Sequence, residues 1–180
     1  AASGTALQAA LQNPLCDPGL LGLSAGASLG AVLAYATGLF MAWPHAVPAA
    51  AFVGALVAIF AVYGIAHAAG PPTTATLLLT GVAIASFGSA VVSLVLLSIG
   101  DYRVHEVFAW LLGSAENRTW RHVELAVVPI ALGLVGLFLA RRLVDALAMG
   151  DEHAQGVGVD LLRARALLFV LVSLAAGAAV

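Results

Sequence analysis

The absence of charged side chains between Pro18 and Gly100 restricts the fold more than any other feature of this sequence. These eighty-three residues contain no Asp, Glu, Lys or Arg. Soluble domains carry about 25% charged residues, whereas this chain carries 9% and is 62% hydrophobic. An apolar stretch of this length is typical of several helices that cross a lipid bilayer. The composition therefore predicts an all-α, polytopic transmembrane protein.

The charged residues that are present exclude several function classes. The net charge of −2 is too small to indicate a nucleic-acid-binding protein. All seven basic residues are Arg, and a phosphate-binding loop requires a Lys. If the protein uses ATP, we therefore expect a partner, or sequence outside these 180 residues, to bind it. Cys16 is the only cysteine, which excludes an intramolecular disulfide. No cofactor and no metal are predicted.

The hydrophobic runs can be divided into spans because a helix needs about 20 residues to cross the bilayer. Residues 1–12 are expected to form the tail of a helix, and the apolar segment 104–113 is too short to span, which predicts an interfacial or re-entrant helix. Pro129 predicts a kink. Because the chain begins and ends in apolar sequence, we expect one membrane domain over residues 1–180, incomplete at both ends. The expected spans are 20–41, 49–66, 73–99, 123–140 and 161–180.

The polar turns give a prediction of orientation. Asn13-Pro14 and Asp17-Pro18-Gly19 predict a turn, since Pro lacks an N–H group and restricts the residue before it. The turns at 13–19, 67–76 and 141–165 would share one side and hold four of the seven Arg residues. Arg residues close to span ends favour the cytoplasmic side.

Small residues at the start of the first span indicate close helix packing. Gly22, Gly26 and Gly30 lie four residues apart and are predicted to share a helix face. The same stretch contains the G-x-S-x-G pattern of serine hydrolases around Ser24. That pattern requires a strand-to-helix turn, so we disfavour a hydrolase, although His67 could lie at the same membrane face.

The longest polar passage between two apolar runs covers residues 143–159. Its pattern predicts a short surface helix over 145–155, with Gly156 and Gly158 near its end. Asp151, Glu152 and His153 are consecutive, and consecutive helical side chains point about 100° apart, so they cannot hold one metal ion unaided. The passage is therefore either a solvated connector or a docking surface. His105 with Glu106 is interpreted in the same way.

Thr73, Thr74 and Thr76 follow Pro71-Pro72 at a predicted helix start. Hydroxyl groups there satisfy free N–H groups of the first turn, so capping is the simplest interpretation, and a gate between two spans is the alternative. Ion-coupled carriers usually place acids or bases inside their spans, and residues 18–100 have none. A secondary carrier of another fold is therefore the weaker functional alternative.

Four motifs carry a specific resemblance. They are NPLCDP at 13–18 followed by LGLSAGA at 21–27, TTATLLLTGVA at 73–83, WLLGS at 110–114, and LAMGDEHA at 147–154 with Gly158-Val159. In this order and spacing they resemble the permease subunits of the iron-siderophore, haem and cobalamin ABC importer family. Those permeases have ten spans, and this chain would run from the end of the second span to the seventh.

The resemblance implies an ATP-driven importer subunit in the cytoplasmic membrane, without catalytic activity of its own. The expected partners are ABC ATPase subunits, an extracytoplasmic substrate-binding protein, a second permease copy and membrane lipid. Thr73 and Thr74 would lie at the cytoplasmic gate, and Ser86, Ser89 and Ser93 would line the pathway. The loop that couples to the ATPase would contain Met149, Gly150, Asp151, Glu152, His153, Ala154 and Gly158.

The chain departs from the family pattern in the second half of that loop. Val157-Gly158 stands in place of Leu-Gly, Gly156 replaces a bulkier residue, and Gln155 stands where a basic residue is common. An additional Gly weakens a helix by about 1 kcal/mol, which predicts a looser end to the loop.

Overall fold

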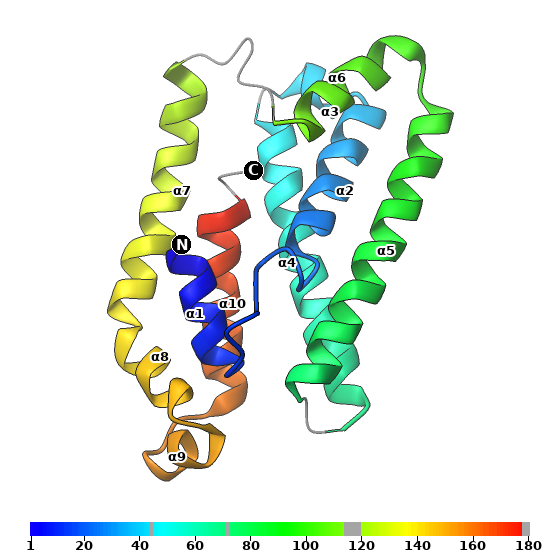
Figure 1. Ribbon diagram of the computed structural model, residues 1–180. Helices are drawn as coiled ribbons and strands as arrows, with labels where there is room; N and C mark the ends of the chain where they lie inside the picture. The colour runs from blue at the N-terminus through cyan, green and yellow to red at the C-terminus, as the bar shows by residue number, and fades with distance from the viewer. Residues whose placement is uncertain (44, 71–72, 114–119, 178–180) are drawn as a thin grey trace.

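The computed structural model describes residues 1–43, 45–70, 73–113 and 120–177, apart from the side chains of residues 74, 101, 102, 121, 122 and 125. The described residues form helices without any strand, which confirms the predicted all-α class. Figure 1 shows these helices packed roughly side by side in one bundle. The helices are α1 (Ala2–Ala10), α2 (Leu23–Ala36), α3 (Leu39–Ala42), α4 (Ala46–Ala68), α5 (Thr74–Ser98), α6 (Asp101–Leu111), α7 (Trp120–Leu139), α8 (Arg141–Ala148), α9 (Asp151–Gly156) and α10 (Leu161–Gly177).

Two described helices are long and apolar enough to cross a membrane, and a bent pair adds a third. The first two are α4 and the segment Ala75–Ser98 of α5. The bent pair joins α7 to α8 at an angle of 58° around Ala140. Pro129 lies inside α7, as it does in the predicted span over 123–140. α10 begins at Leu161 as predicted and is described as far as Gly177.

The predicted span over 20–41 is wrong in its length. α2 begins at Leu23, covers 14 residues and ends before Gly38. Gly22 and Gly38 adopt φ angles of +78° and +72°, which a right-handed helix does not contain, and each lies at the N-terminal end of a helix. The apolar run is therefore divided into one short helix, α2, and the single turn α3.

Many of the helix ends lie at one of the two opposite ends of the bundle (Figure 1). The short helices α3 and α6 lie at one end, together with the start of α7. The end of α4, the start of α5 and the α8–α9 turn lie at the other end. The predicted helix near 104–113 is confirmed as α6, which lies at the end of the bundle rather than across it.

The contact between α2 and α4 brings two backbones together at glycine. A Cβ atom on Gly26 would overlap the Gly54 carbonyl oxygen and lie 2.5 Å from the Ala58 Cβ. A Cβ on Gly30 would overlap the Ala50 carbonyl. The predicted packing role is thus confirmed for Gly26 and Gly30. Gly22 precedes α2, and a Cβ on it would lie 3.5 Å from the Gly81 carbonyl oxygen of α5. Gly22 therefore does not share the helix face of Gly26 and Gly30.

The connection between α1 and α2 is irregular backbone that lies against protein. Asn13 and Asp17 accept hydrogen bonds from the backbone N–H groups of Leu15 (2.9 Å) and Gly19 (2.7 Å), which confirms the predicted polar turns. In Figure 1 the connection runs from the lower end of α1 to mid-height, where α2 begins. Gly81 of α5 lies so close that a Cβ there would overlap the Leu20 carbonyl. Non-helical backbone at membrane depth is stable only where protein or water surrounds it.

α10 packs against α1, α4 and α7 and connects the two halves of the chain. Its Phe169 packs edge-on against Tyr63 of α4, with 5.5 Å between the ring centroids. A Cβ on Gly133 of α7 would lie 2.8 Å from the Ala175 Cβ of α10. Leu168 and Val172 of α10 have no exposed surface. A displacement of α10 therefore has to be shared with α4 and α7.

Two glycine substitutions test the close helix contact. Gly26→Ala should lower the stability of the purified protein by about 1–3 kcal/mol, because its methyl group overlaps backbone and cannot be relieved by a rotamer change. Gly64→Ala is the matched control, since Gly64 lies in α4 with no atom within 4 Å of its Cβ position, and should be neutral or stabilising. Thermal unfolding in detergent measures both. Equal melting temperatures would contradict the packing role of Gly26.

Candidate functional site

The polar passage between α7 and α10 folds into two helices rather than the single helix predicted over 145–155. Gly150 interrupts it with φ +116° and ψ 153°, a region essentially restricted to glycine. The Gly150 N–H still donates to the Leu147 carbonyl (3.1 Å), and its carbonyl accepts from the Ala154 N–H (2.9 Å). Gly150 thus closes α8 and opens α9 within one residue, which produces a sharp corner at the end of the bundle.

The corner has an inner and an outer side. Leu147 and Ala154 have no exposed surface and anchor α8 and α9 against the bundle. Met149 is 72% exposed, and Glu152 and His153 are exposed on the outer side. Met149, Glu152 and His153, three positions of mixed chemistry, therefore face outward from the corner. This arrangement suits contact with another protein.

Asp151 faces the bundle, unlike its neighbour Glu152. Both of its carboxylate oxygens accept hydrogen bonds from Arg165 Nη2, at 2.8 and 2.9 Å. Arg165 is 7% exposed, and its Nε donates to the Ala10 carbonyl at the end of α1 (3.2 Å). Gln12 Nε2 donates to the Leu147 carbonyl (3.3 Å) and contacts Asp151 Oδ1 (3.5 Å). One acid of the loop is therefore internal and the other is external.

The end of the loop is more regular than the glycine content suggested. Gly156 is the last residue of α9, and a Cβ there would meet no atom within 4 Å. Gly158 adopts φ +85°, and the next N–H, of Val159, donates to the Ala154 carbonyl (2.9 Å). This is the hydrogen-bond pattern with which a left-handed glycine ends a helix. Gly158 is thus required by the backbone, whereas Gly156 is not.

Thr73 forms a capping box at the start of α5. The Thr76 N–H donates to Thr73 Oγ1 (3.2 Å), and the Thr73 N–H donates to Thr76 Oγ1 (2.9 Å). The capping interpretation is confirmed for Thr73, which is exposed at the same end of the bundle as α9. Thr74 is the first residue of α5, and its side chain lies outside the described residues.

The three serines predicted to line a pathway are all exposed on α5. The spacing of Ser86, Ser89 and Ser93 places them on one side of the helix. Another side of the helix contacts the connection before α2 through Gly81 and α2 itself through Gly88. Only 11% of the most apolar part of α5 is buried within this chain. The serine side is therefore free to face a pathway or a second subunit. Ser93 Oγ donates to the Ser89 carbonyl of its own helix (2.9 Å).

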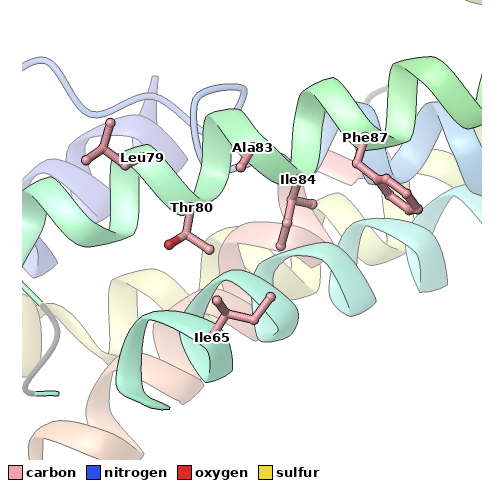
Figure 2. Close-up of a pocket in the computed structure, with 6 residues that line it drawn as sticks. All are labelled: Ile65, Leu79, Thr80, Ala83, Ile84 and Phe87. Carbon is pink, nitrogen blue, oxygen red and sulfur yellow. The ribbon is translucent and has the colours of Figure 1, made fainter. Parts of the chain in front are cut away.

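A shallow groove between α4 and α5 contains none of these serines. Figure 2 shows Ile65 of α4 facing the α5 side chains, with the Thr80 hydroxyl as the only polar group drawn. Ile65 and Phe87 are 56% and 70% exposed. An apolar groove on the outer surface suits lipid or another helix rather than a polar solute. The lining residues are Ile65, Leu79, Thr80, Ala83, Ile84 and Phe87.

The hydrolase and metal-site interpretations gain no support from the geometry. Ser24 lies in the first turn of α2, and the described residues contain no strand that could form a nucleophile elbow. His67 stacks on Tyr63 of its own helix, with 6.3 Å between ring centroids. Across the described part of the chain, no three His, Cys, Asp or Glu side chains come together in a group that could hold a metal ion.

The comparisons with known proteins decide the family. The profile of the FecCD transport family matches residues 1–180, which is the whole chain. The chain belongs to the FecCD transport family. This confirms the resemblance drawn from the four motifs.

The names of its relatives mention three different substrates. A cobalamin import system permease protein, BtuC, of Halobacterium salinarum is 38% identical over 180 residues, covering 100% of this chain and 48% of that protein. A hemin transport system permease protein, HmuU, of Yersinia pestis is 32% identical and is covered to 54%. A probable iron chelatin transport system permease protein of Helicobacter pylori is 32% identical and is covered to 53%. The chain thus spans about half the length of these FecCD relatives.

The fold of this FecCD chain also matches a solved structure. A metal-chelate type ABC transporter in an inward-facing conformation superposes with a TM-score of 0.81, covering 99% of this chain and 56% of that one. The identity is 23%, so the match concerns the fold alone. The chain is part of an integral membrane protein of the FecCD transport family, and its described helices are arranged as in that structure.

Sequence reasoning did not identify Arg165 and Gln12 as part of the loop's environment. Arg165 was counted only as a positive charge near a span end, whereas it is a buried partner of Asp151. A signal was available, since Arg163 and Arg165 differ by two residues and two positions on a helix point in nearly opposite directions. Gln12, with φ +49°, follows the end of α1 and gave no comparable signal.

Two glycines of the loop should respond oppositely to the same substitution. Gly150→Ala should destabilise the purified permease by about 1–3 kcal/mol, because alanine is strained at φ +116°. Gly156→Ala should stabilise it by about 0.5–1 kcal/mol, because the position is helical and open. Thermal unfolding without the ATPase present measures both. A destabilising effect of Gly156→Ala would contradict this prediction, because a methyl group at residue 156 meets no other atom in this arrangement of helices.

Proposed function

We propose that this chain forms part of the membrane-spanning subunit of an ATP-driven importer in the cytoplasmic membrane. The importer carries cobalamin, haem or an iron chelate inward by alternating access, and the subunit itself has no catalytic activity. Membership of the FecCD transport family and the names of its relatives support this assignment. Its partners are two ABC ATPase subunits, an extracytoplasmic binding protein and a second permease copy.

The observation that carries the proposal is the exposed corner of α8 and α9. Met149, Glu152 and His153 face outward at one end of the bundle, while Leu147 and Ala154 hold the corner from inside. A protein that drives transport from outside the membrane needs a protruding contact of this kind. We therefore call residues 149–158 the coupling loop and place its ATPase contact at these outer side chains.

The same end of the bundle contains the proposed gate. Thr73 lies at the start of α5, which carries Ser86, Ser89 and Ser93 on its exposed side. We propose that a second permease copy faces this side and that the translocation pathway runs between the two. The end with the coupling loop and Thr73 is then cytoplasmic, in agreement with the distribution of Arg residues.

Alternating access requires that ATP binding favours one arrangement of the helices over another. A ligand shifts such an equilibrium only by its difference in affinity for the two states. This chain contains no ATP site of the Lys-containing kind, so we assign the differential contact to the ATPase and the coupling loop. This gives the loop a role in energy transfer as well as in attachment.

Charge reversal on the outer side of the loop tests ATPase attachment. Glu152→Arg in the full-length gene product should reduce co-purification of the ATPase, because an exposed acid at the contact becomes a cation. Glu124→Arg is the matched control, since Glu124 is exposed on α7 at the opposite end of the bundle. Both variants should insert normally. Undiminished co-purification with Glu152→Arg would contradict ATPase contact at this side chain.

Uptake into proteoliposomes tests the energy source and the substrate class. Cyanocobalamin, haem and a ferric hydroxamate are offered separately to the permease reconstituted with its ATPase and binding protein. One of them should accumulate with ATP and not without it. Uptake that persists without the ATPase and collapses with the proton gradient would instead identify a secondary carrier.

A further inference from the structure

We propose that the ion pair between Arg165 and Asp151 is the positioning contact through which a displacement of the coupling loop reaches α10 and α1. The proposal rests on the function proposed above, because it assumes that the ATPase moves this loop. It assigns the two adjacent acids of the loop different tasks. Glu152 faces the partner, and Asp151 transmits to the bundle.

The first step in the argument is how weakly α9 is otherwise held. Ala154 is its only buried residue, and its small side chain offers little area for packing. Met149 and Val157, which flank α9, are 72% and 60% exposed. A six-residue helix with so little buried surface would tilt independently of the bundle unless a directional contact held it.

The second step is the geometry of the pair. Arg165 Nη2 donates to both oxygens of Asp151, at 2.8 and 2.9 Å, while its Nε donates to the Ala10 carbonyl at 3.2 Å. One planar guanidinium group therefore connects the start of α9, the first turns of α10 and the last turn of α1. A cation at the C-terminal end of α1 is also favoured by the helix dipole.

The third step is burial. The Arg165 side chain is 8% exposed and the Asp151 side chain 38% exposed. Separating the pair would leave a buried cation without its counter-charge, so the two groups resist separation more strongly than a surface pair would. A displacement of α9 that keeps this contact must carry Arg165 with it, and with it α10.

A neighbouring ion pair provides the contrast within the same helix. Arg163 Nε lies 3.3 Å from Asp160 Oδ2, and these side chains are 88% and 53% exposed. That pair lies within one turn and connects no second element. Exposed pairs of this kind contribute little to stability. Arg163 is therefore a matched control for Arg165.

Spin-label distances in the full-length complex in nanodiscs test whether α9 and α10 move together. Labels are placed at Gln155 of α9 and Leu167 of α10, both exposed, and Cys16 can remain because it is 1% exposed. With Asp151 and Arg165 intact, the distance should be the same without nucleotide and with Mg-ATP trapped by vanadate. With Asp151→Asn, which retains the shape and removes the charge, the distance should shift and broaden when nucleotide binds.

Coupling is measured on the same variants. Asp151→Asn and Arg165→Met should retain ATPase co-purification and hydrolysis, whereas uptake per ATP hydrolysed should fall about tenfold, a typical size for a lost coupling contact. Uptake is followed with the probe among cyanocobalamin, haem and ferric hydroxamate that the unmodified complex carries. Asp151→Glu should restore coupling because it retains the carboxylate. Arg163→Met should match the unmodified protein.

Three results would overturn the inference. One is a nucleotide-dependent α9–α10 distance in the protein with the pair intact, a measurement that needs no variant to fold. Another is an unchanged distance in Asp151→Asn, which would assign the connection to the backbone turn at Gly158. The third is unchanged uptake per ATP in that variant. Failure of the proposed function has a separate signature, namely that Glu152→Arg leaves ATPase co-purification intact.

Discussion

The backbone contact between α2 and α4 is the constraint on which the rest of the bundle depends. Lipid tails are as apolar as the side chains, so burying apolar side chains between helices gives no gain in hydrophobic free energy. Helices in a bilayer therefore associate through close packing. Gly26, Gly30 and Gly54 remove the side chains that would keep the two backbones apart. α5 then packs through Gly81 against Leu20 and Leu21, and so encloses the irregular connection before Leu23. Without that enclosure, the non-helical backbone would face lipid with unsatisfied polar groups.

A different kind of contact holds the end of the bundle that carries the coupling loop. There the chain leaves the apolar region, and charge and backbone conformation replace glycine packing. Gly150 sets the corner, and Arg165 attaches it to α1 and α10. α10 in turn packs against α4 through Phe169 and against α7 through Ala175. The loop is thus connected through one helix to most of the described bundle, an arrangement suited to a permease that a partner drives from one end.

The parts of the fold that could be predicted depend on local signals. The spans of α4 and α5 followed from length and hydropathy, and the cap at Thr73 followed from hydroxyl groups at a helix start. The predicted span over 20–41 failed because hydropathy does not report the left-handed conformation of Gly22 and Gly38. The predicted helix over 145–155 failed for the same reason at Gly150. A glycine is compatible with both conformations, and its neighbours in space decide between them.

The sequence by itself determined that the chain is an all-α membrane protein, that it lacks a Lys-containing ATP site, and that its motifs belong to an importer family. These conclusions follow from composition and from local patterns that no folding step can change. Only the tertiary structure decided which side each charge faces. Asp151 and Glu152 are adjacent acids with nearly the same chemistry, yet only Asp151 faces the buried Arg165. That distinction arises because α1 and α10, 155 residues apart at Ala10 and Arg165, meet beneath the loop.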